Sequence, residues 1–202
     1  MDLTLNCLAI TCSLKPSPDA SSSEKIAEQI LDELRALGAT GESVRAVDFA
    51  IAPGVETDMG DGDQWPEIRE KVLAADILIL ATPTWLGQHS SVAQRVLERL
   101  DAELSETDGS GRPILFDKVA LAAIVGNEDG AHHIAAILFQ SLNDVGFTVP
   151  AQGSVYWNGE AMQGVDYQDL PQTPEKVAQA MKTAAANAAH LARSLKISHY
   201  PA

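Results

Sequence analysis

Residues 76–82 read DILILAT, a run of apolar side chains with a polar residue at each end. Apolar runs of this length between polar positions are typical of a strand that is covered on both faces. Such strands belong to parallel sheets, in which the connecting helices pack on each side. The stretch therefore predicts a central strand of a parallel sheet.

The segments on either side of this strand alternate between strand and helix patterns. Apolar residues recur at helical spacing through residues 26–37, and Gly38 is placed to end that helix. The same reasoning predicts five strands, at 3–10, 43–49, 76–82, 119–125 and from 147. It predicts five helices, at 26–37, 65–75, 92–104, 134–145 and from 173. Strict alternation predicts one α/β domain over residues 1–202, with a parallel sheet between two helical layers.

Composition excludes several classes of protein. Asp and Glu outnumber Lys and Arg by 28 to 14, for a net charge of -14, so we expect no nucleic-acid partner. No window reaches the roughly 18 apolar residues of a membrane span, and we expect a cytoplasmic protein. Two cysteines, Cys7 and Cys12, cannot build a disulfide framework, and we expect both to be reduced core thiols.

Ligands of open α/β sheets bind beyond the carboxyl ends of the strands, which directs attention to the loops there. The first loop, residues 11–23, is rich in hydroxyls, contains Lys15 and ends at a helix start, which favours an anion such as a phosphate monoester. The alternative is that Ser21 caps the helix and Glu24 completes a capping box. No glycine-rich dinucleotide or triphosphate motif is present.

Two further loops carry residues suited to a planar ring. Trp85 and Gly87 follow the third strand, where an indole can stack on a ring and backbone amides can reach its edge. Trp85 could instead cover the core or anchor an interface, and Ser91 with Gln94 also forms a capping-box pattern. Asn127 follows the fourth strand and could bind a polar ring edge, although its loop also has the composition of an ordinary turn.

Adjacent His132 and His133 point about 100° apart on a helix, so we expect no metal site there.

These loops resemble those of the flavodoxin-like NAD(P)H-dependent FMN and quinone reductases. Residues 12–15 with the serines at 21–23 are similar to the phosphate loop of that superfamily, although Cys12 and Lys15 replace its usual glycine and arginine. Pro83, Trp85 and Gly87 match its ring-contacting loop, and Ser90 stands where a proline is common. The resemblance implies a five-stranded sheet of order 2-1-3-4-5, with FMN bound by Ser13, Lys15, Ser17, Ser21, Ser22, Ser23, Pro83, Thr84, Trp85, Leu86, Gly87, Gly126, Asn127, Glu128, Asp129 and Gly130.

The resemblance also implies a reaction. NAD(P)H would reduce bound FMN, which would pass electrons to a quinone, a flavin or a similar small acceptor, with no catalytic side chain required. The alternatives are an electron carrier served by a separate reductase, and a scaffold that has lost its flavin. Homo-oligomers are common in the resembling families, and we expect a homodimer in which the loops at 50–64 and 153–172, with Tyr156, Trp157 and Tyr167, wall the flavin. The alternative is that these tyrosines belong to a surface loop packed on its own domain.

Overall fold

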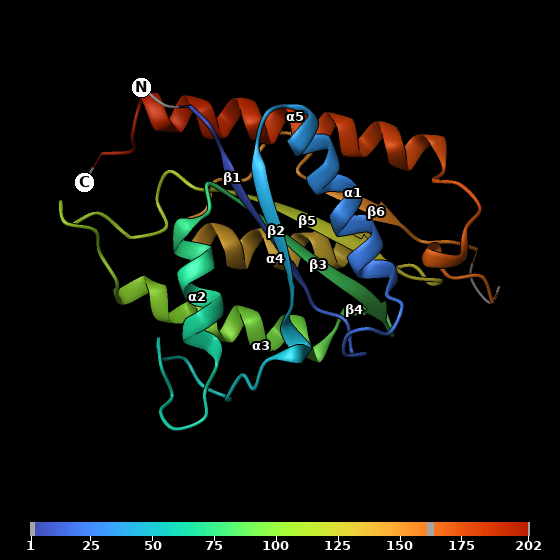
Figure 1. The fold of residues 1–202 in the computed structure, drawn as a ribbon, viewed down its shortest axis with the longest axis horizontal. Helices are drawn as coiled ribbons and strands as arrows, with labels where there is room; N and C mark the ends of the chain where they lie inside the picture. The colour runs from blue at the N-terminus through green and yellow to red at the C-terminus, as the bar shows by residue number, and fades with distance from the viewer. Residues whose placement is uncertain (1–2, 161–163, 202) are drawn as a thin grey trace.

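The computed structural model describes residues 3–160 and 164–201, and it has three layers (Figure 1). Five parallel strands form the central sheet in the order β2-β1-β3-β5-β6. The strands are β1 (Asn6–Thr11), β2 (Thr40–Arg45), β3 (Ile77–Trp85), β5 (Val119–Val125) and β6 (Ser154–Trp157). This confirms the predicted fold and strand order. The sequence patterns missed β4 (Gln88–His89), a two-residue strand antiparallel to the end of β3.

Five helices cover the two faces of the sheet. They are α1 (Ser22–Ala36), α2 (Trp65–Ala74), α3 (Ser91–Leu100), α4 (Ala131–Asp144) and α5 (Glu175–Ile197). Helices α1 and α5 pack on one face, and α2, α3 and α4 pack on the other (Figure 1). Three short 3₁₀ helices, η1 (Ala46–Asp48), η2 (Asp101–Ser105) and η3 (Tyr167–Asp169), lie in the connections.

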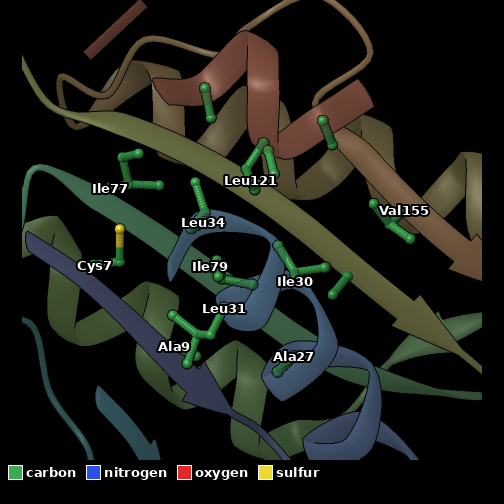
Figure 2. Packing of buried hydrophobic residues seen from close by; sticks show 14 of the residues in the cluster. Cys7, Ala9, Ala27, Ile30, Leu31, Leu34, Ile77, Ile79, Leu121 and Val155 are labelled. Carbon is green, nitrogen blue, oxygen red and sulfur yellow. The ribbon is translucent and has the colours of Figure 1, made fainter. Parts of the chain in front are cut away.

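The alternation of side chains along each strand builds a separate core on each face of the sheet. Cys7 and Ile79 pack beneath α1, where Ile30 and Leu34 meet them (Figure 2). Their strand neighbours point to the other face, where Leu80 joins the cluster beneath α2, α3 and α4. Burying one such aliphatic side chain contributes about 1.5–3 kcal/mol, so both faces hold the helical layers in place.

The fifth strand lies later than the sequence pattern predicts. Thr148, in the segment from 147 to 149, makes only an isolated bridge to Val119, and β6 begins at Ser154. Pro150 has no backbone N–H to donate, and Gln152 has a positive φ of 55°, so the chain turns before it rejoins the sheet. Similarly, β2 ends at Arg45, and residues 46–48 of the predicted strand form η1.

Two of the longer connections, at 50–64 and 105–117, are held by contacts to residues distant in the sequence. In the segment from 50 to 64, the Asp63 carboxylate pairs with Arg99 on α3, and both side chains are buried. In the segment from 105 to 117, Asp117 accepts a hydrogen bond from the N–H of Tyr200 near the C-terminus. The segment from 153 to 172 contains β6 and η3. Within the parts of the chain that are described, none of the helices combines the length and hydropathy that crossing a bilayer requires.

Candidate functional site

A cavity of about 260 Å³ opens at the carboxyl edge of the sheet, where β1, β3 and β5 end. It lies between the loop after β1, the end of β3, the start of the loop after β5, and a segment that follows β6. The sequence-predicted residues in its lining are Ser13, Lys15, Ser21, Ser22, Ser23, Pro83, Thr84, Trp85, Gly126 and Asn127. Three loops far apart in the sequence are thus brought together.

The start of α1 supplies hydrogen-bond donors to the cavity. The Ser21 hydroxyl caps the helix by accepting from the N–H of Glu24. The N–H groups of Ser22 and Ser23 have no acceptor in the described chain, as is usual for a first helical turn. Unpaired N–H groups and the positive end of the helix dipole attract anions. The cavity therefore has an anion-attracting end.

The predicted capping box is only half correct. The carboxylate of Glu24 does not return to the backbone of Ser21; it forms an ion pair with Arg45 of β2. The guanidinium of Arg45 also donates to the carbonyl oxygens of Lys15, Pro16 and Asp19, at 3.2, 2.8 and 2.8 Å. Its side chain is buried, so Arg45 fixes the shape of the loop after β1 from behind. The sequence patterns missed Arg45 because only the β1–β2 pairing brings it near this loop.

Ser17 lies outside the lining of the cavity. Its hydroxyl donates to Asp48 at 2.6 Å, and its N–H donates to the other oxygen of the same carboxylate at 2.8 Å. These two bonds fix the side of the loop that faces η1. Lys15, by contrast, lines the cavity and its ammonium group has no partner in the described residues, so it is available to an anion.

Aromatic side chains also line the cavity. Trp85, 55% exposed, stands on the β3 side, and Trp157 stands on the β6 side. Trp157 packs against Tyr167 with ring centroids 5.5 Å apart. The cavity thus combines a donor-rich end with flat apolar walls, which suits a ligand that has a charged group and a planar ring.

A β-hairpin carries Trp85 at the rim. Leu86 and Gly87, which connect β3 to β4, have φ values of 52° and 73°, as the two central residues of a type I′ turn require. The Leu86 N–H donates to the Glu128 carboxylate at 2.8 Å. A Cβ on Gly130 would lie 2.8 Å from the Cα of Gly87, so the two loops touch through glycines.

Several predicted ring-contacting residues therefore support the rim and do not line the cavity. They are Leu86, Gly87, Glu128, Asp129 and Gly130. Leu86 is 92% exposed at the tip of the hairpin.

A segment that the sequence patterns did not assign to the site forms its remaining wall. Asp166, Tyr167 and Gln168 line the cavity, and Asp166 accepts a hydrogen bond from the Asn127 amide at 2.9 Å. Lys25 of α1 donates to the carbonyl oxygens of Tyr167 and Gln168 at 3.2 and 3.1 Å.

Tyr167 is buried, and its hydroxyl donates to Gln29 at 2.6 Å. It is therefore a core residue of its own chain, contrary to the prediction that it belongs to a dimer interface. The Ser22 hydroxyl accepts from the N–H of Gln168 at 3.2 Å, which ties this wall to the start of α1. A long-range contact of this kind leaves no local pattern in the sequence.

The loop after β3 is also fixed from beneath. Ser90, which is buried, caps α3 by accepting from the Ala93 N–H, and its hydroxyl donates to the carbonyl oxygen of Cys12 at 2.7 Å. The predicted cap at Ser91 is wrong by one residue. The side chain of Gln94 pairs with His89 and Glu98, so it completes no capping box.

Both thiols are buried and unpaired, as predicted for core cysteines. Desolvation by burial raises the pKa of Cys7 to about 12 and also raises the pKa of Cys12 well above its ordinary value. A thiol must ionise to act as a nucleophile, so neither is poised for catalysis.

The adjacent histidines interact separately with their neighbours. His132 contacts the Tyr156 hydroxyl at 3.0 Å, and His133 contacts the Gln88 side chain at 3.1 Å. Across residues 3–160 and 164–201, no group of three or more His, Cys, Asp or Glu residues is placed to hold a metal ion.

Comparison with known proteins assigns the family. A family model described as NADPH-dependent FMN reductase matches residues 5–161. The chain belongs to this family. It is a flavin-dependent oxidoreductase family with a flavodoxin-like fold, as the resemblance implied.

Two relatives of this FMN reductase family member extend the comparison. It is 31% identical over 209 residues to the 8-demethyl-8-aminoriboflavin-5'-phosphate synthase of Streptomyces davaonensis, with 98% of this chain and 81% of the relative covered. It is 39% identical over 169 residues to a protein of Mycobacterium bovis named divalent metal cation transporter MntH. That match covers 82% of this chain but only 25% of the relative, so the chain spans a quarter of the longer protein.

Solved structures agree with the fold. The crystal structure of RosB with the bound intermediate 8-demethyl-8-formylriboflavin-5'-phosphate superposes with a TM-score of 0.87 at 30% identity, covering 98% of this chain and 82% of that one. An NADH:FMN oxidoreductase, EMOB, superposes with a TM-score of 0.66 at 20% identity, covering 95% and 90% of the two chains.

The residues of the cavity fit FMN. The serines at the start of α1 and Lys15 offer donors for a phosphate, and the indoles offer walls for a ring. Gly126 allows the floor of the cavity to pack closely, because a Cβ there would lie 2.8 Å from the Cβ of Thr84. The Thr84 hydroxyl is buried in this floor without a hydrogen-bond partner in the described chain.

Proposed function

We propose that this chain is an FMN-dependent oxidoreductase that takes electrons from NAD(P)H and delivers them to a quinone, a flavin or a similar small acceptor. The observation that carries the proposal is one cavity lined both by the first turn of α1 and by two indoles. FMN, when bound, supplies the hydride and electron-transfer chemistry.

In this proposal the role of the chain is to bind FMN and to orient its ring. The Ser22 and Ser23 N–H groups, the Ser13 hydroxyl and Lys15 hold the phosphate. Lys15 matters because the net charge of -14 repels a phosphate unless a local cation opposes it. Trp85 and the rim hairpin position one side of the ring, while the exposed side of the cavity admits the second substrate.

A second candidate follows from the synthase relative. Its 31% identity extends over 98% of this chain, and the related RosB structure holds a flavin phosphate as an intermediate. The same cavity could thus bind the flavin as a substrate that is chemically altered.

We also retain a homodimer and a cytoplasmic location as predictions.

One experiment separates these functions. The purified protein is mixed anaerobically with FMN and NADPH, and the absorbance is followed. A second sample is incubated with FMN in air with an added amino-group donor, and the mass of the released flavin is measured by mass spectrometry. Rapid bleaching with an unchanged flavin mass supports the oxidoreductase. Bleaching only after a separate reductase is added supports an electron carrier, a changed flavin mass supports the synthase-like function, and no uptake of FMN refutes all three.

A further inference from the structure

The tip of the hairpin between β3 and β4 carries a leucine whose side chain is almost entirely in solvent. Leu86 is 92% exposed, and the next most exposed of the large apolar side chains that the structure describes is Ile197, at 62%. A single exposed leucine is common on protein surfaces and needs no special explanation. Leu86 is different because its backbone conformation also disfavours leucine.

The turn at the hairpin tip favours other residue types. Leu86 has a φ of 52° at the first central position of a type I′ turn, where asparagine, aspartate and glycine are preferred. A bulky side chain is strained in this left-handed conformation. Asparagine would fit the turn and would place a polar group in water. Leucine thus breaks two local rules at once, and positions that do so are concentrated at functional sites.

The fold does not use the side chain of Leu86. The hairpin tip is fixed by its backbone, because the Leu86 N–H donates to Glu128 at 2.8 Å and Gly87 lies against Gly130. A side chain that is 92% exposed adds almost nothing to the packing of the domain. The contact that would account for a leucine is therefore expected from a molecule outside this chain.

Leu86 lies beside the mouth of the cavity described above. It directly follows Trp85, which lines the cavity and is 55% exposed. Leu14, which is 47% exposed, lines the same cavity from the loop after β1. We call Leu14, Trp85 and Leu86 the rim patch. A molecule that reaches a ring bound in the cavity enters past these apolar side chains, so an apolar substituent on that molecule would be buried against them.

The charge of the chain favours a neutral molecule at this patch. The net charge of -14 repels anions, and Lys15 is the one Lys or Arg side chain in the described lining of the cavity. In the proposed function Lys15 holds the phosphate of FMN. An electron acceptor with a phosphate of its own, such as a second FMN, would find no further cation in that lining, whereas a neutral quinone needs none.

We propose that Leu86 is a specificity-determining residue that contacts an aliphatic substituent of the electron acceptor, and that this acceptor is a neutral quinone with an alkyl chain. The inference rests on the proposed oxidoreductase function and selects one class among its acceptors. NAD(P)H gives up a hydride and becomes NAD(P)+, solvent supplies one proton, and the quinone gains two electrons and two protons to become the hydroquinone. The alkyl chain is unchanged, so Leu86 affects the binding of the acceptor and takes no part in the chemistry.

The test compares two quinones that share one ring. The FMN-loaded protein is supplied with NADH or NADPH, whichever bleaches it faster, and with methyl-p-benzoquinone or pentyl-p-benzoquinone. The ratio of the two kcat/KM values is measured for wild type, Leu86→Asn, Leu86→Met and Leu104→Asn. Leu86→Met keeps an apolar side chain on the same backbone. Leu104→Asn is the matched control, because Leu104 is 57% exposed on η2 and lies outside the lining of the cavity.

The expected ratios follow from the burial of methylene groups. One buried methylene changes an affinity about fourfold, so contact over one or two of them is worth about tenfold. We expect wild type, Leu86→Met and Leu104→Asn to prefer the pentyl quinone about tenfold. In Leu86→Asn the preference should fall below about threefold, mainly through a higher KM for the pentyl quinone.

Two measurements without turnover accompany the kinetics. Orcinol and olivetol are dihydroxybenzenes with a methyl and a pentyl group at the same position, and neither can be oxidised to a simple quinone. Their affinities for the FMN-loaded protein, measured by isothermal titration calorimetry, should show the same ratios. Leu86→Asn should melt at or above the wild-type temperature, because asparagine tolerates a positive φ better than leucine. A lost preference would then not reflect unfolding.

Three results would overturn the inference. They are no preference for the pentyl compounds in wild type, a preference that Leu86→Asn retains, and an equal loss of kcat/KM for both quinones in that variant. A retained preference together with a changed sedimentation coefficient in Leu86→Asn would assign the leucine to a contact between copies of the chain.

The proposed function fails by a different signal. Its failure is the absence of bleaching by NADH and by NADPH in the loaded wild-type protein, which would overturn both proposals. Bleaching together with equal pentyl-to-methyl ratios in wild type and Leu86→Asn would leave the proposed function standing and overturn the role assigned to Leu86.

Discussion

Replacing Arg45 by methionine tests whether the buried side chain of Arg45 determines the shape of the loop after β1. The guanidinium of Arg45 pairs with Glu24 and donates to three carbonyl oxygens of the loop, and the side chain is 3% exposed. Removing one partner of a buried ion pair costs about 3–5 kcal/mol. Glu24 is 38% exposed and can regain water, so we expect the low end, about 3 kcal/mol.

This loss of stability should lower both the melting temperature and the affinity for FMN. For a domain of this size, 1 kcal/mol shifts the melting temperature by about 2–4 °C, so Arg45→Met should melt about 6–12 °C below wild type. The loop must then be ordered when FMN binds, and ordering one residue costs about 1–2 kcal/mol, which weakens FMN binding about tenfold.

The assay is thermal unfolding by circular dichroism, together with an FMN fluorescence titration. Arg35→Met is the control, because Arg35 is an exposed cation that pairs with Glu28 and Asp32, and such pairs contribute about 0–1 kcal/mol. If Arg45→Met melts within about 2 °C of wild type and binds FMN equally well, our account of this loop is wrong.

Three further predictions concern other parts of the site and fold. Lys15→Ala should weaken FMN about tenfold in a fluorescence titration, with less effect at high salt, because it removes the one unpartnered cation in the described lining of the cavity. Gly130→Ala should lower the melting temperature and the affinity for FMN, because Gly130 has a φ of 132° and a Cβ there would meet the Gly87 backbone at 2.8 Å. Burial by itself would raise the pKa of Asp63, but hydrogen bonds from backbone N–H groups and from Arg99 hold it at about 2. Its contribution to stability is therefore full above the ordinary value of 3.8 and is lost as pH falls toward 2, so Asp63→Asn should destabilise the protein at about pH 6 and much less at about pH 2, as measured by urea unfolding.

Two of these predictions have a matched control, and the third has a pH profile that can contradict it. Lys182→Ala changes the net charge as Lys15→Ala does, and equal loss of FMN affinity in the two would indicate a general field effect. Gly60 has a φ of 95°, but a Cβ added there would meet no heavy atom within 4 Å, so Gly60→Ala isolates backbone strain from collision. A pH profile for Asp63→Asn that parallels wild type down to about pH 2 would contradict the assigned role of that carboxylate.

The periodic parts of the sequence predicted the fold well. The run at 76–82 and its neighbours predicted a parallel sheet between two helical layers. A strand that is covered on both faces consists almost entirely of apolar residues, as in β5, where every residue from Val119 to Val125 is buried. Predictions that needed only local chemistry were less accurate. The Ser91 cap was shifted to Ser90, and the final strand was displaced by the turn at Pro150.

The site was only partly predictable for the same reason. Ser21, Trp85 and Asn127 could be assigned to it because each lies at or near the end of a strand or at the start of a helix. Arg45 holds the loop beside the cavity, and residues 166–168 line the cavity. Their tertiary contacts span from 21 to 146 positions along the chain, so no spacing in the sequence reveals them.

The hairpin that carries Leu86 has a consequence for how this scaffold can change. Its tip is fixed through its own backbone atoms, by the Glu128 carboxylate and by the contact between Gly87 and Gly130, while the Leu86 side chain projects into solvent. Evolution, or a protein engineer, can therefore exchange residue 86 beside the mouth of the cavity and alter which molecules enter, at little cost to folding. Asparagine, which tolerates a positive φ better than leucine, is the natural first choice for such a library.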